Sequence, residues 1–221
     1  MARLITGLDP GRVREGAARV REEIAAAARR AGRDPAEVDL LAAVKYVPAG
    51  ELGVLAEAGL TLLGENRAQD LEAKAAAHPG AFRWHFIGQL QSRKVKVILP
   101  HVELIHSVAS DSALSQLERH GTPGTEVLVE VNVAGEDDKA GVAPGELAAF
   151  LQRTPVRVAG LMTMPPYAED PEASRPHFAA LRELAREHGL RHLSMGTSQD
   201  FAVAVEEGAT IVRVGSVLYG A

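Results

Sequence analysis

The sequence predicts an α/β fold, a closed (β/α)8 TIM barrel with one extra helix at its N-terminal end. Two observations predict this fold. Short apolar segments rich in β-forming residues alternate with amphipathic segments along most of the chain. Most of these apolar segments lack a polar face, which is typical of parallel strands covered on both sides. Eight such steps within 221 residues fit one closed barrel, so we expect residues 1–221 to form a single domain.

The extra helix at the front has clear boundary signals. Asp9 can cap its first turn, and Pro10 already has the φ angle that suits a first helical position. Apolar residues then recur at helical spacing as far as Ile24. Gly32 is expected to end the helix.

The repeating part of the chain begins after Pro35. We expect strands at 38–44, 61–63, 83–87, 103–107, 126–133, 157–163, 192–195 and 210–214. We expect the intervening helices at 51–58, 65–77, 92–99, 111–119, 144–153, 171–188 and 200–207.

An open, doubly wound sheet is the alternative arrangement of the same elements. That fold predicts a glycine-rich phosphate turn after an early strand. The first expected strand instead runs into residues 44–48, which contain no glycine. The closed barrel is therefore favoured.

Composition argues against several classes of function. The net charge is −5 and the basic residues are scattered, so the basic stripe that nucleic acid requires is absent. The lack of cysteine excludes disulfides and thiolate metal sites. The acidic residues 136–138 lack the spacing of a calcium loop, so no metal is expected. Neither a signal peptide nor a membrane-spanning segment is recognisable, which makes the cytoplasm the expected location.

Active groups of β/α barrels come from the carboxyl ends of the strands, and phosphate is often bound after strands 7 and 8. The two loops at these positions are rich in glycine and hydroxyl residues. They contribute Met195, Gly196, Ser198, Gly215 and Ser216. Glycine lets backbone N–H groups approach an anion closely, and the helix expected to begin near Asp200 would direct its positive end there. Two ordinary capped turns are the alternative interpretation.

Lys45 ends the first expected strand, directly after the apolar or small residues 40–44. It is either a surface lysine that extends into solvent or an amine that forms a Schiff base. Burial would favour the second role, because desolvation disfavours the ammonium form. Together with a phosphate site across the barrel mouth, this lysine indicates a phosphorylated aldehyde as the ligand.

Arg213 ends the eighth strand, and His85 lies within the third. Arg213 either forms an ion pair across the barrel rim or faces a pyridine nitrogen, as an Arg or Asp commonly does in proteins that bind pyridoxal 5′-phosphate (PLP). A guanidinium would leave that nitrogen unprotonated, because it does not give up its own proton. His85 is a candidate cofactor contact, and a packed core histidine is the alternative.

Several blocks of residues, in order from about residue 38 to the C-terminus, point to one family. They are Val44-Lys45, Gly64-Glu65-Asn66-Arg67, Trp84-His85-Phe86-Ile87-Gly88-Gln89-Leu90-Gln91, His106-Ser107, Glu130-Val131-Asn132, Gly160-Leu161-Met162-Thr163, Leu193-Ser194-Met195-Gly196 and Arg213-Val214-Gly215-Ser216. Together they resemble the YggS/PROSC family, the PLP homeostasis proteins.

The resemblance implies a fold-type III PLP barrel similar to the barrel domain of alanine racemase. In that family the lysine matching Lys45 carries PLP as an internal aldimine, and the arginine matching Arg213 meets the ring nitrogen. Asn66 lies near the cofactor. The phosphate is held by residues that match Ser198, Gly215 and Ser216. The implied role is to hold PLP reversibly and to supply apo PLP-dependent enzymes, without turnover of its own.

Three positions depart from the usual pattern of the family. Thr197 stands where a methionine is common, Ala109 where an aspartate is frequent, and Arg93 where an asparagine precedes Lys94. These departures affect the details of cofactor contacts and partner surfaces. They leave the lysine itself unchanged.

Two other functions remain open at this point. A PLP-dependent amino-acid racemase of this barrel type uses a second, β-rich domain that supplies a tyrosine, whereas this chain ends just after its eighth strand and has only three tyrosines. A cofactor-free lyase in which Lys45 attacks a phosphosugar would share the lysine and the phosphate site. We expect a monomer, since the chain lacks that second domain.

Overall fold

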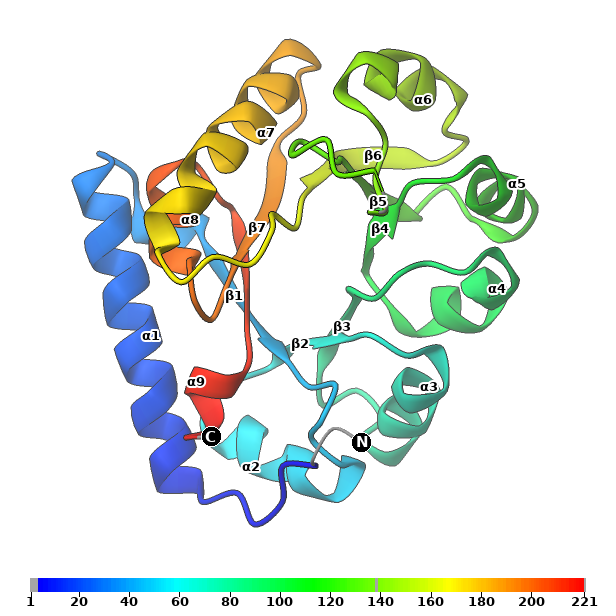
Figure 1. The fold of residues 1–221 in the computed structure, drawn as a ribbon. Helices are drawn as coiled ribbons and strands as arrows, with labels where there is room; N and C mark the ends of the chain where they lie inside the picture. Colours follow the sequence, from blue (N-terminus) through cyan, green and yellow to red (C-terminus); the bar gives the residue numbers. More distant parts are fainter. Residues whose placement is uncertain (1–3, 138, 221) are drawn as a thin grey trace.

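A closed barrel of eight parallel strands, paired in chain order, forms the centre of the molecule (Figure 1). This computed structural model describes residues 4–137 and 139–220. The strands are β1 Asp39–Ala43, β2 Leu62–Glu65, β3 Arg83–Phe86, β4 Leu104–Val108, β5 Glu126–Glu130, β6 Arg157–Met162, β7 His192–Thr197 and β8 Ile211–Val214. Because β1 pairs in parallel with both β2 and β8, the sheet is closed. The predicted barrel is confirmed, and the open sheet is excluded.

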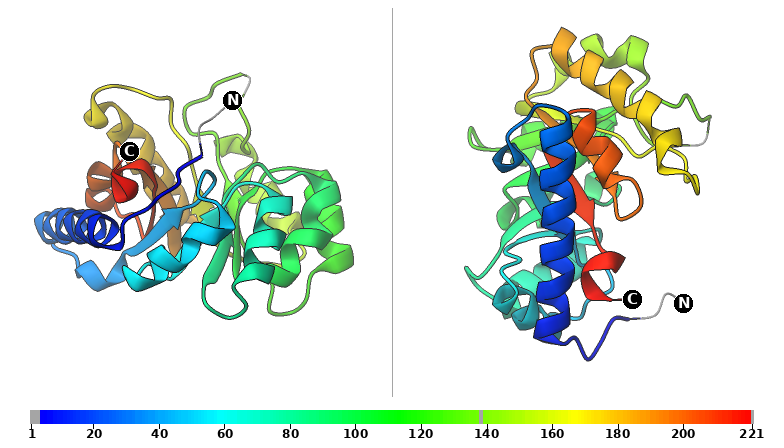
Figure 2. Two further views of the ribbon diagram at one scale, coloured as in Figure 1. Left: turned by 90° about the horizontal axis from the view of Figure 1, so that it is seen from below. Right: turned by 90° about the vertical axis from the view of Figure 1, so that its left-hand side faces the viewer.

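Helices surround the barrel and cover the outer face of its wall. They are α1 Pro10–Arg30, α2 Leu52–Glu57, α3 Ala68–Ala77, α4 Val95–Ile98, α5 Asp111–His120, α6 Leu147–Arg153, α7 Arg175–Glu187, α8 Phe201–Glu206 and α9 Ser216–Tyr219. The extra N-terminal helix α1 runs along the outside and packs on α8 and α9 (Figure 2). It begins as predicted, with the Asp9 carboxylate accepting the amide N–H of Arg12.

The helix predicted at 65–77 begins later than the sequence suggested. Glu65 is the last residue of β2, where it pairs with Phe86 of β3. Arg67 is still extended, and α3 starts only at Ala68. The strand expected at 61–63 therefore continues to Glu65. The side chain of this glutamate has a buried partner in α3. The predicted strand 126–133 is also too long, since β5 ends at Glu130. The short helix α9 was not predicted.

Strand alternation divides the core into two layers. One layer fills the space between the wall and the helices. The other lies inside the barrel and consists of Leu41, Leu62, Leu104, Leu128, Ala159, Met162 and Ile211. Two positions further along several strands the inward side chains become polar: His106 follows Leu104, Glu130 follows Leu128, and Arg213 follows Ile211. The barrel interior is thus apolar at its base and polar towards the carboxyl ends of the strands.

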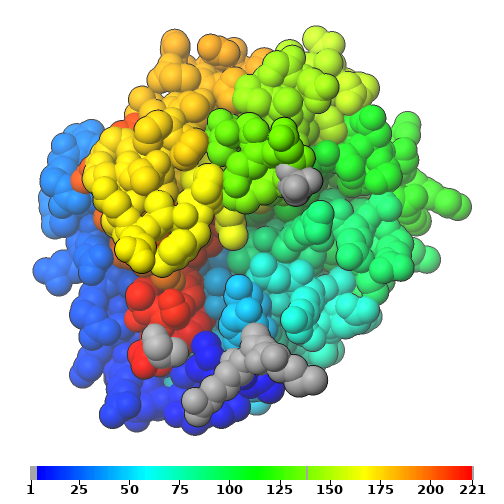
Figure 3. All heavy atoms as spheres, viewed as in Figure 1, coloured from blue at the N-terminus to red at the C-terminus, as the bar shows by residue number. Residues whose placement is uncertain are grey.

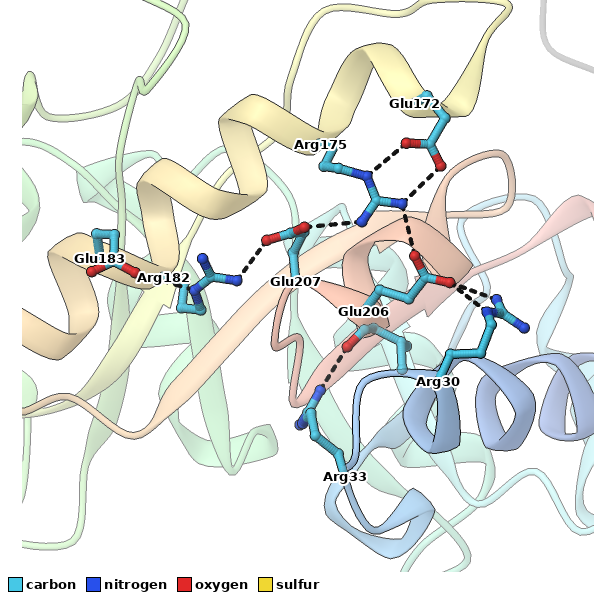
Figure 4. A network of polar contacts seen from close by, with 9 residues as sticks. Arg30, Arg33, Glu172, Arg175, Arg182, Glu183, Glu206 and Glu207 are labelled. Atoms are coloured by element: carbon cyan, nitrogen blue, oxygen red, sulfur yellow. Dashed lines mark hydrogen bonds and ion pairs between the residues drawn. The ribbon is translucent and has the colours of Figure 1, made fainter.

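An exposed network of ion pairs links α1, α7 and α8 on the outside of the barrel (Figure 4). Arg175 at the start of α7 binds Glu206, Glu207 and Glu172, the last from the turn before the helix. Glu206 also binds Arg30 of α1 at 2.7 Å. This network fixes α8, the helix that follows the loop at 195–200. None of the helices within residues 4–137 and 139–220 is both long and apolar enough to cross a membrane.

Candidate cofactor-binding site

A pocket of about 500 Å³ opens at the carboxyl ends of the strands. Figure 3 views the molecule from this side, with the loops after the strands around a central hollow. Of the predicted site residues, the pocket lining contains Lys45, Asn66, Ser198, Arg213, Gly215 and Ser216. One cavity therefore brings together residues from the first strands and from the last strands of the barrel. Ile5, Tyr46, Met164, Thr197 and Tyr219 also line it, and most of these residues had no predicted role.

Lys45 lies just past the last residue of β1, at the rim of the barrel. Its ammonium Nζ stands 4.7 Å from the centroid of the Tyr46 ring. The side chain is exposed at the pocket mouth, so the burial that the Schiff-base interpretation assumed is not observed. Lys45 is exposed because it lies beyond the end of β1. Its side chain extends into the pocket opening and not into the packed barrel wall.

Buried polar groups hold the backbone that carries Lys45. Lys74 of α3 donates from Nζ to the carbonyl oxygen of Val44 at 2.7 Å and forms an ion pair with Glu65 at 2.5 Å. The Tyr219 hydroxyl donates to the neighbouring carbonyl of Ala43 at 3.1 Å. Burial raises the pKa of this hydroxyl well above its usual value. Both contacts fix the end of β1, so the lysine starts from a rigid position.

The two loops expected to hold phosphate are in contact with each other. The amide N–H of Gly215 donates to the hydroxyl oxygen of Ser198 at 3.0 Å. In the first loop Thr197 donates from both its amide and its hydroxyl to Oδ1 of Asp200, at 2.7 and 3.1 Å. Asp200 thus closes this loop on itself, and no side chain caps the first turn of α8. The amides at the start of α8 remain uncapped, in the position where the sequence predicted an anion.

Gly196 allows this loop to pack against α8. Its φ is +90°, and a Cβ atom built there would lie 2.5 Å from Cβ of Ala204. A larger residue would push the loop away from the helix. Met195, just before it, points outwards into the helix layer and is fully buried. Neither residue is part of the pocket lining, so both support the loop from behind.

Arg213 reaches the pocket from inside the barrel and is only 6% exposed. Its guanidinium donates to Oγ of Ser194 at 2.5 Å and to the carbonyl oxygen of Thr163 at 2.9 Å. Burial lowers its pKa to about 10, and the nearby charge of Glu130 opposes that shift. Within residues 4–137 and 139–220 it forms no ion pair. Some of its five N–H groups therefore remain available to a ligand.

His85 lies beneath the pocket and not in its lining. Its Nδ1 is 2.9 Å from Nε2 of His106, whose Nδ1 is in turn 2.8 Å from Oγ of Ser194. Burial lowers the pKa of His85 to about 3 and that of His106 well below its usual value. Both rings are therefore neutral near pH 7. His106 and Ser194 were expected near the carboxyl ends of their strands but were not among the predicted site residues, although the alternation of inward positions along these strands was a usable signal.

A second, smaller pocket of about 360 Å³ adjoins the first, and Asn66, Ile87 and Met164 line both. It contains Glu130 and Lys139. Burial raises the pKa of the Glu130 carboxyl, with a smaller opposing effect from the charge of Arg213. The two pockets form one continuous mouth on the barrel.

The donor groups of the larger pocket fit a phosphorylated aldehyde with a ring nitrogen. Lys45 offers a primary amine, Arg213 offers N–H donors that protein groups do not use, and the two loops offer hydroxyl and amide groups for an anion. Oδ1 of Asn66 is buried and has no hydrogen-bond partner among the described residues. An unpaired buried acceptor is costly unless a ligand meets it.

Comparisons with known proteins agree with this fit. The family described as "Alanine racemase, N-terminal domain" matches residues 17–221. A pyridoxal phosphate homeostasis protein of Aquifex aeolicus is 44% identical over 220 residues, covering 93% of this chain and 96% of that protein.

Solved structures give the same result. PipY of Synechococcus elongatus, determined with PLP bound, superimposes with a TM-score of 0.77 at 32% identity, over 94% of this chain and 100% of that one. A protein of Bifidobacterium adolescentis, described as unknown, has a TM-score of 0.87 at 33% identity, over 99% and 98% of the two chains. As its sequence motifs predicted, the chain belongs to the alanine racemase N-terminal domain family and, within it, to the pyridoxal phosphate homeostasis proteins.

Proposed function

We propose that this protein is a single-domain carrier that holds PLP as a Schiff base on Lys45 and takes part in PLP homeostasis. One observation carries the proposal: a single pocket contains the Lys45 amine, the Arg213 guanidinium and the two loops of Ser198 and Gly215. These groups match the aldehyde, the ring nitrogen and the phosphate of one ligand. The names of its relatives and the PLP-bound structure of PipY support the same ligand.

Each group has a distinct task in this proposal. Lys45 provides the amine for the aldehyde, and Asn66 offers its unpaired Oδ1 to the cofactor. Ser198, Gly215 and Ser216 bind the phosphate. Gly196 and Met195 hold the first phosphate loop against α8, and His85 supports Arg213 from below the pocket.

Arg213 also bears on the reactivity of a bound cofactor. PLP supplies an electron sink when its ring nitrogen is protonated. A guanidinium donates a hydrogen bond and keeps its own proton, so it leaves that nitrogen neutral. The electron sink is then weaker than it would be with a protonated ring nitrogen.

The tyrosines give no support to a two-base racemase. Tyr219 donates its hydroxyl to a backbone carbonyl and its pKa is raised, so it is a poor base. Tyr167 is 82% exposed. Tyr46 lies on the same side of the pocket as Lys45, with its ring beside the ammonium group. We therefore propose no turnover, and a racemisation and decarboxylation screen of the PLP-loaded protein tests this; robust turnover of any amino acid would overturn it.

The wider setting is part of the same proposal. A carrier of this kind would act as a monomer in the cytoplasm and deliver PLP to apo PLP-dependent enzymes. Transfer to a purified apo-enzyme, followed by the activity of that enzyme, measures delivery directly. No gain of activity over that given by an equal amount of free PLP would contradict a delivery role.

The visible spectrum of the purified protein, with and without added PLP, is the main test of the site. We expect an absorption band that borohydride reduction fixes onto a peptide containing Lys45. The band should be absent in Lys45→Ala and unchanged in Lys96→Ala, which removes an exposed lysine of α4. A cofactor-free lyase would show no band in any variant.

A further inference from the structure

A chain of three hydrogen bonds runs behind Arg213 through the interior of the barrel. It links Arg213 of β8 to Ser194 of β7 at 2.5 Å, Ser194 to His106 of β4 at 2.8 Å, and His106 to His85 of β3 at 2.9 Å. All four side chains are at least 94% buried, since their exposed fractions range from 0 to 6%. The protein itself therefore supplies the hydrogen-bond partners of these four side chains along the chain.

The chemistry of the guanidinium fixes the direction of the first bond in this chain, and the single hydroxyl hydrogen of Ser194 then favours one direction for the other two. Arginine has only donors, so Oγ of Ser194 must accept from Arg213. The single hydroxyl hydrogen of Ser194 is then free to go to Nδ1 of His106, which accepts it. A neutral His106 consequently has its hydrogen on Nε2 and donates it to Nδ1 of His85.

The same logic ends at His85. Because Nδ1 of His85 accepts from His106, the hydrogen of the neutral His85 ring is on Nε2. This arrangement satisfies all three contacts and gives the single hydrogen of Ser194 an acceptor. In the reverse order Oγ of Ser194 would accept from both Arg213 and His106, and its own hydrogen would have no partner among the described residues.

We propose that Ser194 and His106 are positioning residues that orient Arg213 towards the ring nitrogen of the cofactor. The contact between Arg213 and PLP rests on the proposed function. The order of the protons in the chain does not depend on that function. Ser194 accepts a hydrogen bond from one Nη group of the guanidinium, and the carbonyl oxygen of Thr163 accepts one from the other at 2.9 Å. Nη2 also donates to Sδ of Met164 at 3.7 Å. The N–H of Nε and the second hydrogen of Nη1 have no partner among the described residues, and the guanidinium lies in the pocket lining.

The low pKa values of both histidines agree with this arrangement. A proton on Nδ1 of His106 would remove the acceptor that Ser194 needs. It would also place a second cation next to Arg213. The chain thus keeps both rings neutral and presents one positive charge at the pocket floor.

The first experiment is nitrogen NMR of the histidine rings in the protein without PLP. We expect both His85 and His106 to have a protonated Nε2 and an unprotonated Nδ1 at pH 7. A hydrogen on Nδ1 of either ring, or a doubly protonated ring, would overturn the proposed order. This result does not depend on whether PLP binds.

Ser194→Ala is the second experiment, with Ser107→Ala as its matched control. Ser107 is a buried hydroxyl of the adjacent position in β4 that donates to the carbonyl oxygen of Gly88 and is not in the chain. We expect Ser194→Ala to lose the single tautomer of His106 and to bind PLP about tenfold more weakly, as for one lost hydrogen bond to a charged group. Ser107→Ala should retain the tautomers.

Covalent attachment to Lys45 should survive in Ser194→Ala, while its absorption band shifts. Wild-type affinity and an unshifted band in this variant would overturn the positioning role, even with the tautomers as expected. If wild-type protein fails to bind PLP, the proposed function fails first, and the NMR result still decides the order of the protons. The wild-type measurement also stands if the variant does not fold.

Discussion

Two buried polar clusters hold the two residues that matter most in the pocket, and they do so in opposite ways. The Glu65–Lys74 pair lies outside the barrel wall, between β2 and α3, and fixes the strand end next to Lys45. The chain from Ser194 to His85 lies inside the wall and fixes Arg213. The first cluster uses two opposite charges, and the second uses neutral groups around a single charge. Two long side chains of opposite charge pair where a helix covers the wall, whereas short and aromatic groups surround the single charge of Arg213 in the interior.

The largest effect is expected from breaking the outer pair. Lys74→Met leaves the fully buried Glu65 carboxylate without its partner, which should lower the free energy of unfolding by about 3–5 kcal/mol. Urea denaturation measures this loss. Adding Glu65→Gln should recover most of it, because the amide oxygen can still accept the backbone N–H groups of Asn66 and Arg67. A loss no greater than that of Lys96→Met would contradict a structural role for the pair.

The stability of the protein should be sensitive to added side-chain volume inside the barrel but not at its outer surface. A Cβ atom at Gly64 would lie 2.3 Å from a methyl group of Leu41 and 2.8 Å from one of Ile87. Gly64→Ala should therefore cost about 1–3 kcal/mol through overpacking. Gly50→Ala is the matched control, since nothing lies within 4 Å of its Cβ position. Equal midpoints for the two variants in denaturant would show that the interior can adapt.

Acid should weaken the inner cluster. Unfolded His85 takes up a proton near its ordinary pKa of 6.5, but the folded ring does so only near 3. The unfolded state therefore binds more protons between these values, and stability falls as the pH is lowered through this window. The expected slope is about 1.4 kcal/mol per pH unit for one such histidine once the pH is well below 6.5.

His85→Gln is the variant that isolates this contribution from the carboxylates. Its unfolding free energy should fall less steeply than that of the wild type between pH 6 and pH 4. Parallel curves for the two proteins would mean that the histidine is already protonated in the folded state.

The smallest effect is expected at the exposed network of Figure 4. Arg175 binds three glutamates, but its side chain is one-third exposed. Arg175→Ala should cost at most about 1 kcal/mol, and 1 M salt should reduce the difference from the wild type. A larger loss that is independent of salt would mean that the network does more than tie surface helices together.

The strand ends could be read from the sequence, whereas the partners behind them could not. Lys45 follows an apolar strand and Arg213 lies near the carboxyl end of another, so the rule that barrel sites form at carboxyl ends located both. Glu65 resembled the start of a helix because it begins a polar stretch, and nothing local indicated that Lys74 would bury it in a strand. Ser194 and His106 are 88 positions apart, and only closure of the barrel brings them together.

The contact between Ser198 and Gly215 has a consequence for how a phosphate would come and go. The Gly215 amide already has a partner within the protein. If the phosphate binds as proposed, the Gly215 amide exchanges its hydrogen bond to Ser198 for one to the phosphate. When the phosphate leaves, the internal hydrogen bond forms again and the amide is not left unpaired. For this hydrogen bond, the loaded and the empty protein then differ little in free energy. That suits a protein that must release its ligand.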